Sequence, residues 1–152
     1  MAIKFKGNEQ QTLALETFVK LVRASNSVSS SCTSVMASQN LTETQFGVLE
    51  SLYHLGPMSQ KQLSEKLLKS GGNITMVIDN LSRNGLVVRQ KRDEDRRFYW
   101  ISLTETGKNL IERIFPDHAV KITERLSVLS PEEQRLLGKL CRKLGLNKGE
   151  NQ

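Results

Sequence analysis

Residues 92 to 97 form a run of six charged residues that reads Arg-Asp-Glu-Asp-Arg-Arg. Two runs of high β propensity flank it, with Leu86-Val87-Val88 before and Tyr99-Trp100-Ile101 after. This order predicts a β-hairpin with the charged residues at its tip. A carboxylate beside an arginine can form a charge-assisted pair that fixes the guanidinium group. The simpler interpretation is a solvated surface ion pair that contributes little to stability.

An arginine held at a hairpin tip is suited to the minor groove of DNA. A narrow minor groove carries a strong negative potential that attracts arginine. Asp95 and Arg97 are two residues apart, which places them on one side of a strand end. Asp95 can therefore orient the guanidinium of Arg97, while Arg92 and Arg96 are candidates for contacts with the DNA backbone.

The charge distribution favours a polyanionic partner for the middle of the chain. The formal net charge is +6 over 152 residues. Residues 58–103 hold nine Lys and Arg against five Asp and Glu, whereas residues 1–57 hold four of each. A local basic excess of this kind is typical of, but not specific to, nucleic-acid-binding domains.

A second group of polar residues precedes the hairpin. Apolar residues recur there at helical spacing and predict a buried helix face: Ile74, Val77, Ile78 and Leu81. The opposite face carries short polar and methyl-bearing side chains: Asn73, Thr75, Met76, Asp79, Asn80, Ser82 and Arg83. Such side chains can reach base edges in a major groove. A merely solvated polar face is the alternative interpretation.

The residues just before this helix can hold a phosphate group. Ser70-Gly71-Gly72 offers free backbone N–H groups beside a helix N-terminus. Lys61, Lys66 and Lys69 lie nearby in the sequence and can attract the DNA backbone by charge.

A helix-turn-helix followed by the hairpin would place the polar helix face and the charged tip on one side of the protein. Ser59 to Gln62 is a capping-box pattern that opens a short helix, with Leu63, Leu67 and Leu68 expected to face inward. A turn over residues 69–73 then precedes the second helix, which Gly85 ends. We therefore predict a winged helix-turn-helix.

Longer helices are expected on both sides of this unit. The patterns predict a helix over residues 10–37 and another from the capping box at Thr42 to Gly56-Pro57. A third begins at Thr104 and has a kink or break at Pro116. The last runs from Ser130 to about Gly145, before a frayed polar tail. The apolar stripes of the outer helices need burial, and packing between two subunits would provide it. A homodimer is therefore a hypothesis from the sequence.

The stretch GGNITMVIDNLSRNGLVVRQKRDEDRRFYWISLTETGKNL, residues 71–110, resembles the core of the multiple antibiotic resistance regulator (MarR) family. The matching features are I-D-N-L, N-G-L-V, the D-x-R of Asp95-Arg96-Arg97, and I-S-L-T-E-T-G, in matching order and spacing. The resemblance extends over roughly residues 10–145.

The resemblance implies a homodimeric regulator, usually a repressor, that binds pseudo-palindromic double-stranded DNA and releases it with a phenolic or lipophilic ligand or on cysteine oxidation. It implies that Arg97 enters the minor groove, that Asp95 orients it, and that residues 73–84 read the major groove. Met76 and Asn80 depart from the pattern, because many relatives carry Arg or Lys there.

The implied fold is mainly α with a small β-hairpin wing. Residues 41–103 would form the winged helix-turn-helix domain, and residues 1–40 and 104–152 would form helical dimerisation arms. A ligand pocket between arms and domain would be lined by aromatic, histidine and methionine residues: Phe18, Tyr53, His54, Met58, Phe115 and His118. Each of them could equally be ordinary core.

Other functions find less support in the sequence. Cys32 and Cys141 are candidate redox sensors, but both fall on predicted apolar stripes, where cysteine is usually an inert small hydrophobe. The two Cys and two His have no metal-site spacing, and no enzyme or cofactor fingerprint occurs. Without a membrane span, secretory signal or CxxC motif, a reduced cytoplasmic protein is expected.

A winged helix that binds protein instead of DNA is the remaining alternative. Such a module needs neither a basic tip nor a polar reading face. DNA binding through phosphate contacts should weaken steeply as salt rises, whereas salt-insensitive or absent binding would favour a protein partner.

We predict that Arg97→Ala weakens operator binding by about 1–3 kcal/mol, because it removes a specific groove contact. The measurement is a gel shift at physiological salt. Binding equal to that of the unaltered protein would show that the wing assignment is wrong.

Overall fold

The computed structural model describes the backbone of residues 5–92 and 95–146, and their side chains except those of residues 92–98. The helices are α1 (Glu9–Ala37), α2 (Glu43–Leu55), α3 (Gln60–Leu67), α4 (Gly71–Arg83), α5 (Glu105–Leu126) and α6 (Pro131–Leu146). The strands are β1 (Met58–Ser59), β2 (Val87–Arg92) and β3 (Asp95–Leu103). The predicted fold class, mainly α with a small β wing, is confirmed.

The chain forms two compact units. One contains residues 32–118 and the other contains residues 1–31 with 119–152. The first unit includes the whole predicted winged helix-turn-helix, residues 41–103. Among the described residues, no helix combines the length and apolar character needed to cross a membrane.

The helices α2, α3 and α6 begin with the capping boxes that the sequence predicted. At α2 the Thr42 hydroxyl accepts the Gln45 N–H at 3.2 Å, and Gln45 Oε1 accepts the Thr42 N–H at 2.8 Å. The same reciprocal pairs occur before α3 and α6: Ser59 with Gln62, and Ser130 with Glu133. Because each box satisfies backbone N–H groups that the helix leaves free, it fixes where the helix begins.

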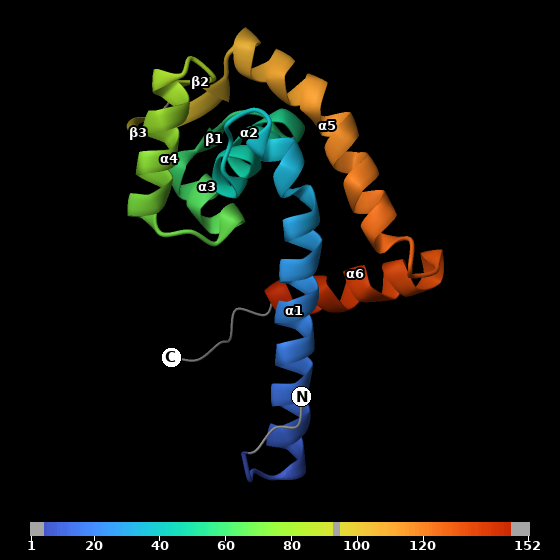
Figure 1. Cartoon of the computed structure of the whole chain (residues 1–152). Coiled ribbons are helices and arrows are strands. Elements are labelled where there is room, and N and C mark those ends of the chain that lie inside the picture. Colours follow the sequence, from blue (N-terminus) through green and yellow to red (C-terminus); the bar gives the residue numbers. More distant parts are fainter. Residues whose placement is uncertain (1–4, 93–94, 147–152) are drawn as a thin grey trace. The chain divides into compact units, whose positions relative to one another are not determined.

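The buried face of α4 packs on α2 and α3. Ile74, Ile78 and Leu81 have no exposed surface, and Leu63 of α3 is equally buried. Val77 is only half-buried. Figure 1 shows α4 beside α3 and the strands β2 and β3. The apolar spacing of this helix was therefore a sound guide to its inward face.

Two details of the helix-turn-helix differ from the prediction. The turn expected over residues 69–73 is shorter, because Ser70 caps α4 by accepting the Asn73 N–H at 3.3 Å and the helix begins at Gly71. Leu68, expected to face inward, is 82% exposed. Its φ of 52° is left-handed, so the chain leaves the helical path there and its side chain leaves the buried stripe.

The wing is part of a three-stranded antiparallel sheet in the order β1-β3-β2. The hairpin pairs Val87 with Leu103 and Arg89 with Ile101. The short strand β1, which the sequence did not predict, pairs Met58 with Ile101. Strand β3 is therefore central and Ile101 is fully buried.

A compact reversal joins α4, the hairpin and α5. Gly85 has a φ of 71°, and the N–H of Leu86 reaches the carbonyl of Leu81 at 2.9 Å, which ends α4 in a Schellman motif. The Thr104 hydroxyl donates to the Gly85 carbonyl at 2.6 Å and accepts the Gly107 N–H at 3.0 Å. The predicted helix stop and the Thr104 cap are thus parts of one arrangement.

Pro116 lies inside α5, which continues from Glu105 to Leu126. The predicted alternative of a break at this proline is wrong. In the other compact unit, every residue of α6 is exposed, including Leu136, Leu140 and Leu144. The apolar stripe predicted for this helix exists but is not covered within the described chain. The predicted frayed tail, residues 147–152, lies outside the described residues.

Gly107→Ala should destabilise the fold by about 1–3 kcal/mol, because a Cβ atom there would stand 2.0 Å from the backbone oxygen of Leu86. Gly138→Ala in α6 is the matched control, since nothing lies within 4 Å of its Cβ position. The control should gain about 0.5–1 kcal/mol from helix propensity. Urea denaturation measures both, and equal stability of Gly107→Ala and the unaltered protein would contradict the prediction.

Candidate nucleic-acid interface

The exposed stripe of α4 is the centre of the candidate interface. Asn73 and Arg83 are exposed, and Met76 is 74% exposed. Steps of three and seven residues keep these positions on one side of a helix. An exposed amide, guanidinium and thioether can donate to base or phosphate oxygens and contact a thymine methyl group. The stripe therefore has the chemistry of a major-groove reader.

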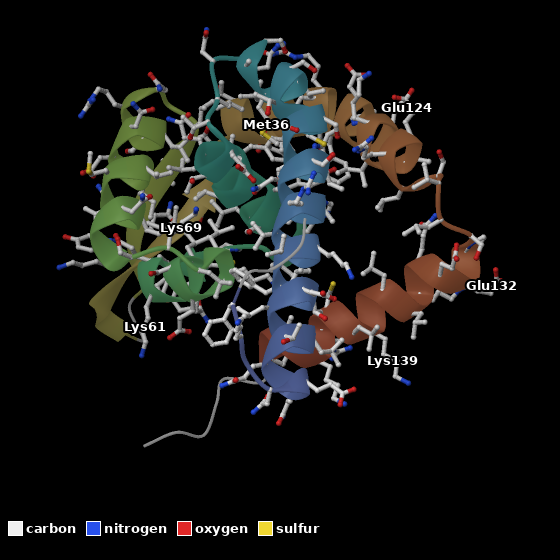
Figure 2. The ribbon with its side chains drawn as sticks, turned by 60° about the horizontal axis from the view of Figure 1, so that its bottom comes forward. Met36, Lys61, Lys69, Glu124, Glu132 and Lys139 are labelled. Carbon is white, nitrogen blue, oxygen red and sulfur yellow. The ribbon has the colours of Figure 1, made fainter. Side chains whose placement is uncertain are left out.

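The N-terminus of α4 adjoins exposed positive charge. Gly71 and Gly72 have open space around their Cβ positions, so a phosphate oxygen could approach their N–H groups closely. Lys61 and Lys69 are exposed, and Figure 2 shows both beside helices α3 and α4. An open hollow of about 410 Å³ lies there, lined by Gln60, Lys61, Ser64, Glu65 and Gly71.

Thr75 ties the start of α4 to α3. Its hydroxyl accepts from Nε2 of Gln60 at 2.5 Å and donates to the carbonyl of Gly71 at 2.9 Å. The side chain is half-buried. Thr75 was predicted to contact DNA. Its hydroxyl proton and one of its two lone pairs are used in these two bonds, which leaves the second lone pair and the methyl group for a base.

Asn80 ties the middle of α4 to the start of α2. Its Oδ1 accepts from Nε2 of Gln45 at 2.7 Å and from Nδ2 of Asn84 at 3.1 Å. Asn80 is half-buried, so part of its side chain remains at the surface. Its amide nitrogen is the group left for DNA.

A third polar contact links α4 to the wing. Asp79 Oδ1 lies 2.5 Å from Nη1 of Arg89 on β2, and their side chains are 44% and 29% exposed. Partial burial limits screening of this ion pair, so it restrains the hairpin relative to α4. Sequence reasoning missed Gln45, Gln60 and Arg89. For Arg89 the sequence held one signal, since Asp79 and Arg89 carry opposite charges on either side of the chain reversal at Gly85.

At the wing tip, the backbone of residue 92 and of residues 95–97 is described without side chains, and residues 93–94 lie outside the described residues. Strand β3 begins at Asp95, which pairs with Arg92 after an irregularity in register. The side chains of Asp95, Arg96 and Arg97 lie outside the described residues, so their predicted roles stay predictions. Further along the hairpin, Nζ of Lys91 lies 5.2 Å from the centroid of the Tyr99 ring.

Most of the predicted ligand residues form a chain of aromatic contacts in the unit of residues 32–118. Ring centroids are 5.1 Å apart for Tyr53 and His54, 4.8 Å for His54 and Phe115, and 5.8 Å for Phe115 and His118. Phe46, which was not predicted, lies 4.6 Å from His118. The ring nitrogen Nδ1 of His118 is buried and has no hydrogen-bond partner among the described residues.

The other predicted sensor residues lie apart from this chain of rings. Met58 is in β1, and Phe18, which is 61% exposed, belongs to the other compact unit. Cys32 is buried, as expected, but Cys141 is exposed, because the α6 stripe is uncovered. Within the described ranges, no group of His, Cys, Asp and Glu is arranged to hold a metal ion.

Comparison with known proteins decides the family. The MarR family model matches residues 41–98. The HTH-type transcriptional regulator MhqR of Bacillus subtilis is 38% identical over 134 residues, covering 88% of this chain and 92% of MhqR. The chain belongs to the MarR family. It is a transcriptional regulator of the MarR type, and the resemblance drawn from its motifs is confirmed.

Solved MarR-like structures share the fold. BpsR of Bordetella bronchiseptica, whose DNA binding is described as regulated by 6-hydroxynicotinic acid, is 26% identical with a TM-score of 0.75, covering 85% of this chain and 98% of BpsR. NadR in complex with 4-hydroxyphenylacetate is 22% identical with a TM-score of 0.77, covering 96% of this chain and 97% of NadR.

The contacts explain part of the MarR-like sequence pattern in this chain. In I-D-N-L, Ile78 and Leu81 are buried. Asp79 forms the ion pair with Arg89 of β2, and Asn80 accepts the hydrogen bond from Gln45 of α2. In L-T-E-T-G, Thr104 bonds both sides of the reversal and Gly107 leaves room for the Leu86 carbonyl. These motif residues therefore fix the position of α4 relative to the wing.

Proposed function

We propose that this MarR-type regulator is a cytoplasmic repressor that binds a pseudo-palindromic DNA site as a homodimer. Helix α4 would lie in the major groove and the hairpin tip in the minor groove. The observation that carries this proposal is the exposed stripe of α4, held from behind by bonds to three other elements. A reading helix fixed in advance loses little freedom on binding, which favours specific recognition.

The positive charge around α4 supports the same assignment. Lys61 and Lys69 are exposed beside the glycine-rich start of the helix, where they could meet the phosphates that flank the reading stripe. Glu65 also lines the hollow, so a phosphate would be held by the lysines and backbone N–H groups, away from this carboxylate. Phosphate contacts would position α4, and the stripe would select the sequence.

A second copy of the chain is the proposed cover for the outer helices. Leu13 and Phe18 of α1 are 64% and 61% exposed. Along α6, Leu136, Leu140 and Leu144 are 57%, 53% and 63% exposed and follow the four-residue spacing of one helix face. A monomer rarely leaves so continuous an apolar surface in water. A homodimer would bury it and present two α4 helices to two half-sites.

Leu140→Glu should shift the protein from dimer to monomer, because burying a carboxylate in an apolar interface is costly. Light scattering after gel filtration should give about 17.2 kDa for the variant and twice that for the unaltered protein. Arg142→Glu is the matched control, since two residues turn the side chain about 200° around the helix. A dimer that survives Leu140→Glu would place the interface elsewhere.

The proposed effector is a small hydroxylated aromatic compound, bound at the ring cluster around His118. The buried Nδ1 of His118 has no partner among the described residues, and a buried polar atom of this kind calls for one. The rings of Phe46, His54 and Phe115 offer aromatic faces beside it. The compounds named with BpsR and NadR are of this class, which supports the choice of probe.

We predict that 4-hydroxyphenylacetate or 6-hydroxynicotinate releases DNA from the unaltered protein and that His118→Phe weakens the response. Phenylalanine keeps a ring beside Phe46 but removes the nitrogen, so the effector affinity should fall by about 1–3 kcal/mol. Fluorescence anisotropy of a labelled operator measures the release.

The control for this variant is its DNA affinity without effector, which should equal that of the unaltered protein. If neither compound releases DNA from the unaltered protein, a phenolic effector of this type is wrong. An unchanged response in His118→Phe would instead remove His118 from the site.

A further inference from the structure

The side chain of Gln45 has a fixed orientation because a backbone group sets it. The Thr42 N–H can only donate, so the Gln45 atom that lies 2.8 Å from it must be the carbonyl oxygen Oε1. Nε2 of Gln45 then faces Asn80, at 2.7 Å. The capping box of α2 therefore presents a hydrogen-bond donor to the reading helix.

This donor in turn fixes the amide of Asn80. The atom of Asn80 that faces Nε2 of Gln45 must be an acceptor, which is Oδ1. The same oxygen accepts from Nδ2 of Asn84 at 3.1 Å. Two donors occupy the two lone pairs of Oδ1, and neither bond involves Nδ2. The group that Asn80 has left for a partner is a donor.

We infer that Asn80 is a donor-only specificity residue whose polarity is set by Gln45. Asparagine usually reads adenine with both amide atoms, accepting from N6 and donating to N7. Here Oδ1 is occupied, so Asn80 can donate to N7 or O6 of guanine, O4 of thymine or N7 of adenine, but cannot accept from a base. Cytosine, which offers only its N4 donor in the major groove, should be rejected at the contacted position.

This inference rests on the proposed placement of α4 in the major groove. It adds that a residue at the start of α2, which need not touch DNA, decides which bases one α4 residue accepts. Two nearby residues of α4 differ from Asn80. The Thr75 hydroxyl accepts from Gln60 and donates to the Gly71 carbonyl, so only one of its lone pairs is left, and Met76 has no strong polar group.

The test selects bound sequences from randomised duplex DNA with the full-length protein and three variants. Asn80→Ala locates the contacted position, where discrimination against cytosine should fall about fivefold. Gln45→Glu keeps an acceptor for the Thr42 N–H, so the capping box survives. Its second oxygen would then turn the Asn80 amide round, present Oδ1 to the DNA, and make cytosine the enriched base.

Asn80→Asp is the second route to the same reversal. Its Oδ1 still accepts from Gln45 and Asn84, and the remaining atom becomes an acceptor, so cytosine should again be enriched. Both acidic variants should bind all DNA more weakly because they repel phosphates. Base preference is a ratio within one variant, so this general loss cancels. Thermal unfolding checks that each variant is folded.

The outcomes separate this inference from the proposed function. No enriched sequence with the unaltered protein would overturn the proposed function itself. An enriched operator whose preferences are the same in Asn80→Ala would show that Asn80 reads no base. If Asn80→Ala relaxes one position but Gln45→Glu and Asn80→Asp keep its original base, Gln45 does not set the polarity of Asn80. Cytosine enrichment in Gln45→Glu supports the inference, whereas cytosine enrichment in Asn80→Asp alone, with the original base kept in Gln45→Glu, would overturn the role of Gln45.

Discussion

The arrangement of α4 and the wing depends on one hydroxyl group. Thr104 Oγ1 donates to the carbonyl of Gly85, just after α4, and accepts from the N–H of Gly107, in the first turn of α5. The Thr104 N–H also bonds the Leu86 carbonyl at 3.1 Å. The end of α4, both ends of the hairpin and the start of α5 are thereby joined within a few ångströms. The Leu86 N–H bond to the Leu81 carbonyl and the Asp79–Arg89 ion pair add further links between α4 and the hairpin.

A reading helix, the role proposed for α4, has to be held by the protein and also to meet a partner, and α4 divides these demands among its faces. Its apolar face is buried, and its exposed stripe is left to a partner. Between these, Thr75, Asp79 and Asn80 bond α3, β2 and α2 respectively. Each of these bonds satisfies a polar group that partial burial would otherwise leave costly. The sequence shows these positions as one polar face. In the structure some of them bond other elements of the protein, and the others are exposed to solvent.

Local signals explain what could be predicted. Capping boxes, the Gly85 stop and the spacing of Ile74, Ile78 and Leu81 act within a few residues, so the sequence alone indicated those features. Leu68 and β1 were missed because a left-handed residue and a two-residue strand depend on the surrounding packing. Within the candidate site, exposure of Met76 was predictable from periodicity.

The bonds that occupy Thr75 and Asn80 were not predictable in the same way. Their partners are Gln60 and Gln45, and the latter is 35 residues away in sequence. Polar residues leave no periodic signal that tells a solvated group from a bonded one. The apolar stripe of α6 shows the complementary limit. Its spacing indicates that burial is needed, but it does not indicate which surface supplies it.

Helix α2 brings the proposed effector site and the reading helix into direct connection. Phe46 packs against His118, and the residue before it, Gln45, bonds Asn80 of α4. His54, at the other end of α2, contacts Phe115. A compound bound at His118 would press on the ring of Phe46, and a shift of α2 there would move the donor of Gln45 away from Asn80. Because a hydrogen bond weakens steeply with poor geometry, a small shift would be enough to release the Asn80 amide. Loss of DNA affinity and loss of base preference would then have the same structural origin.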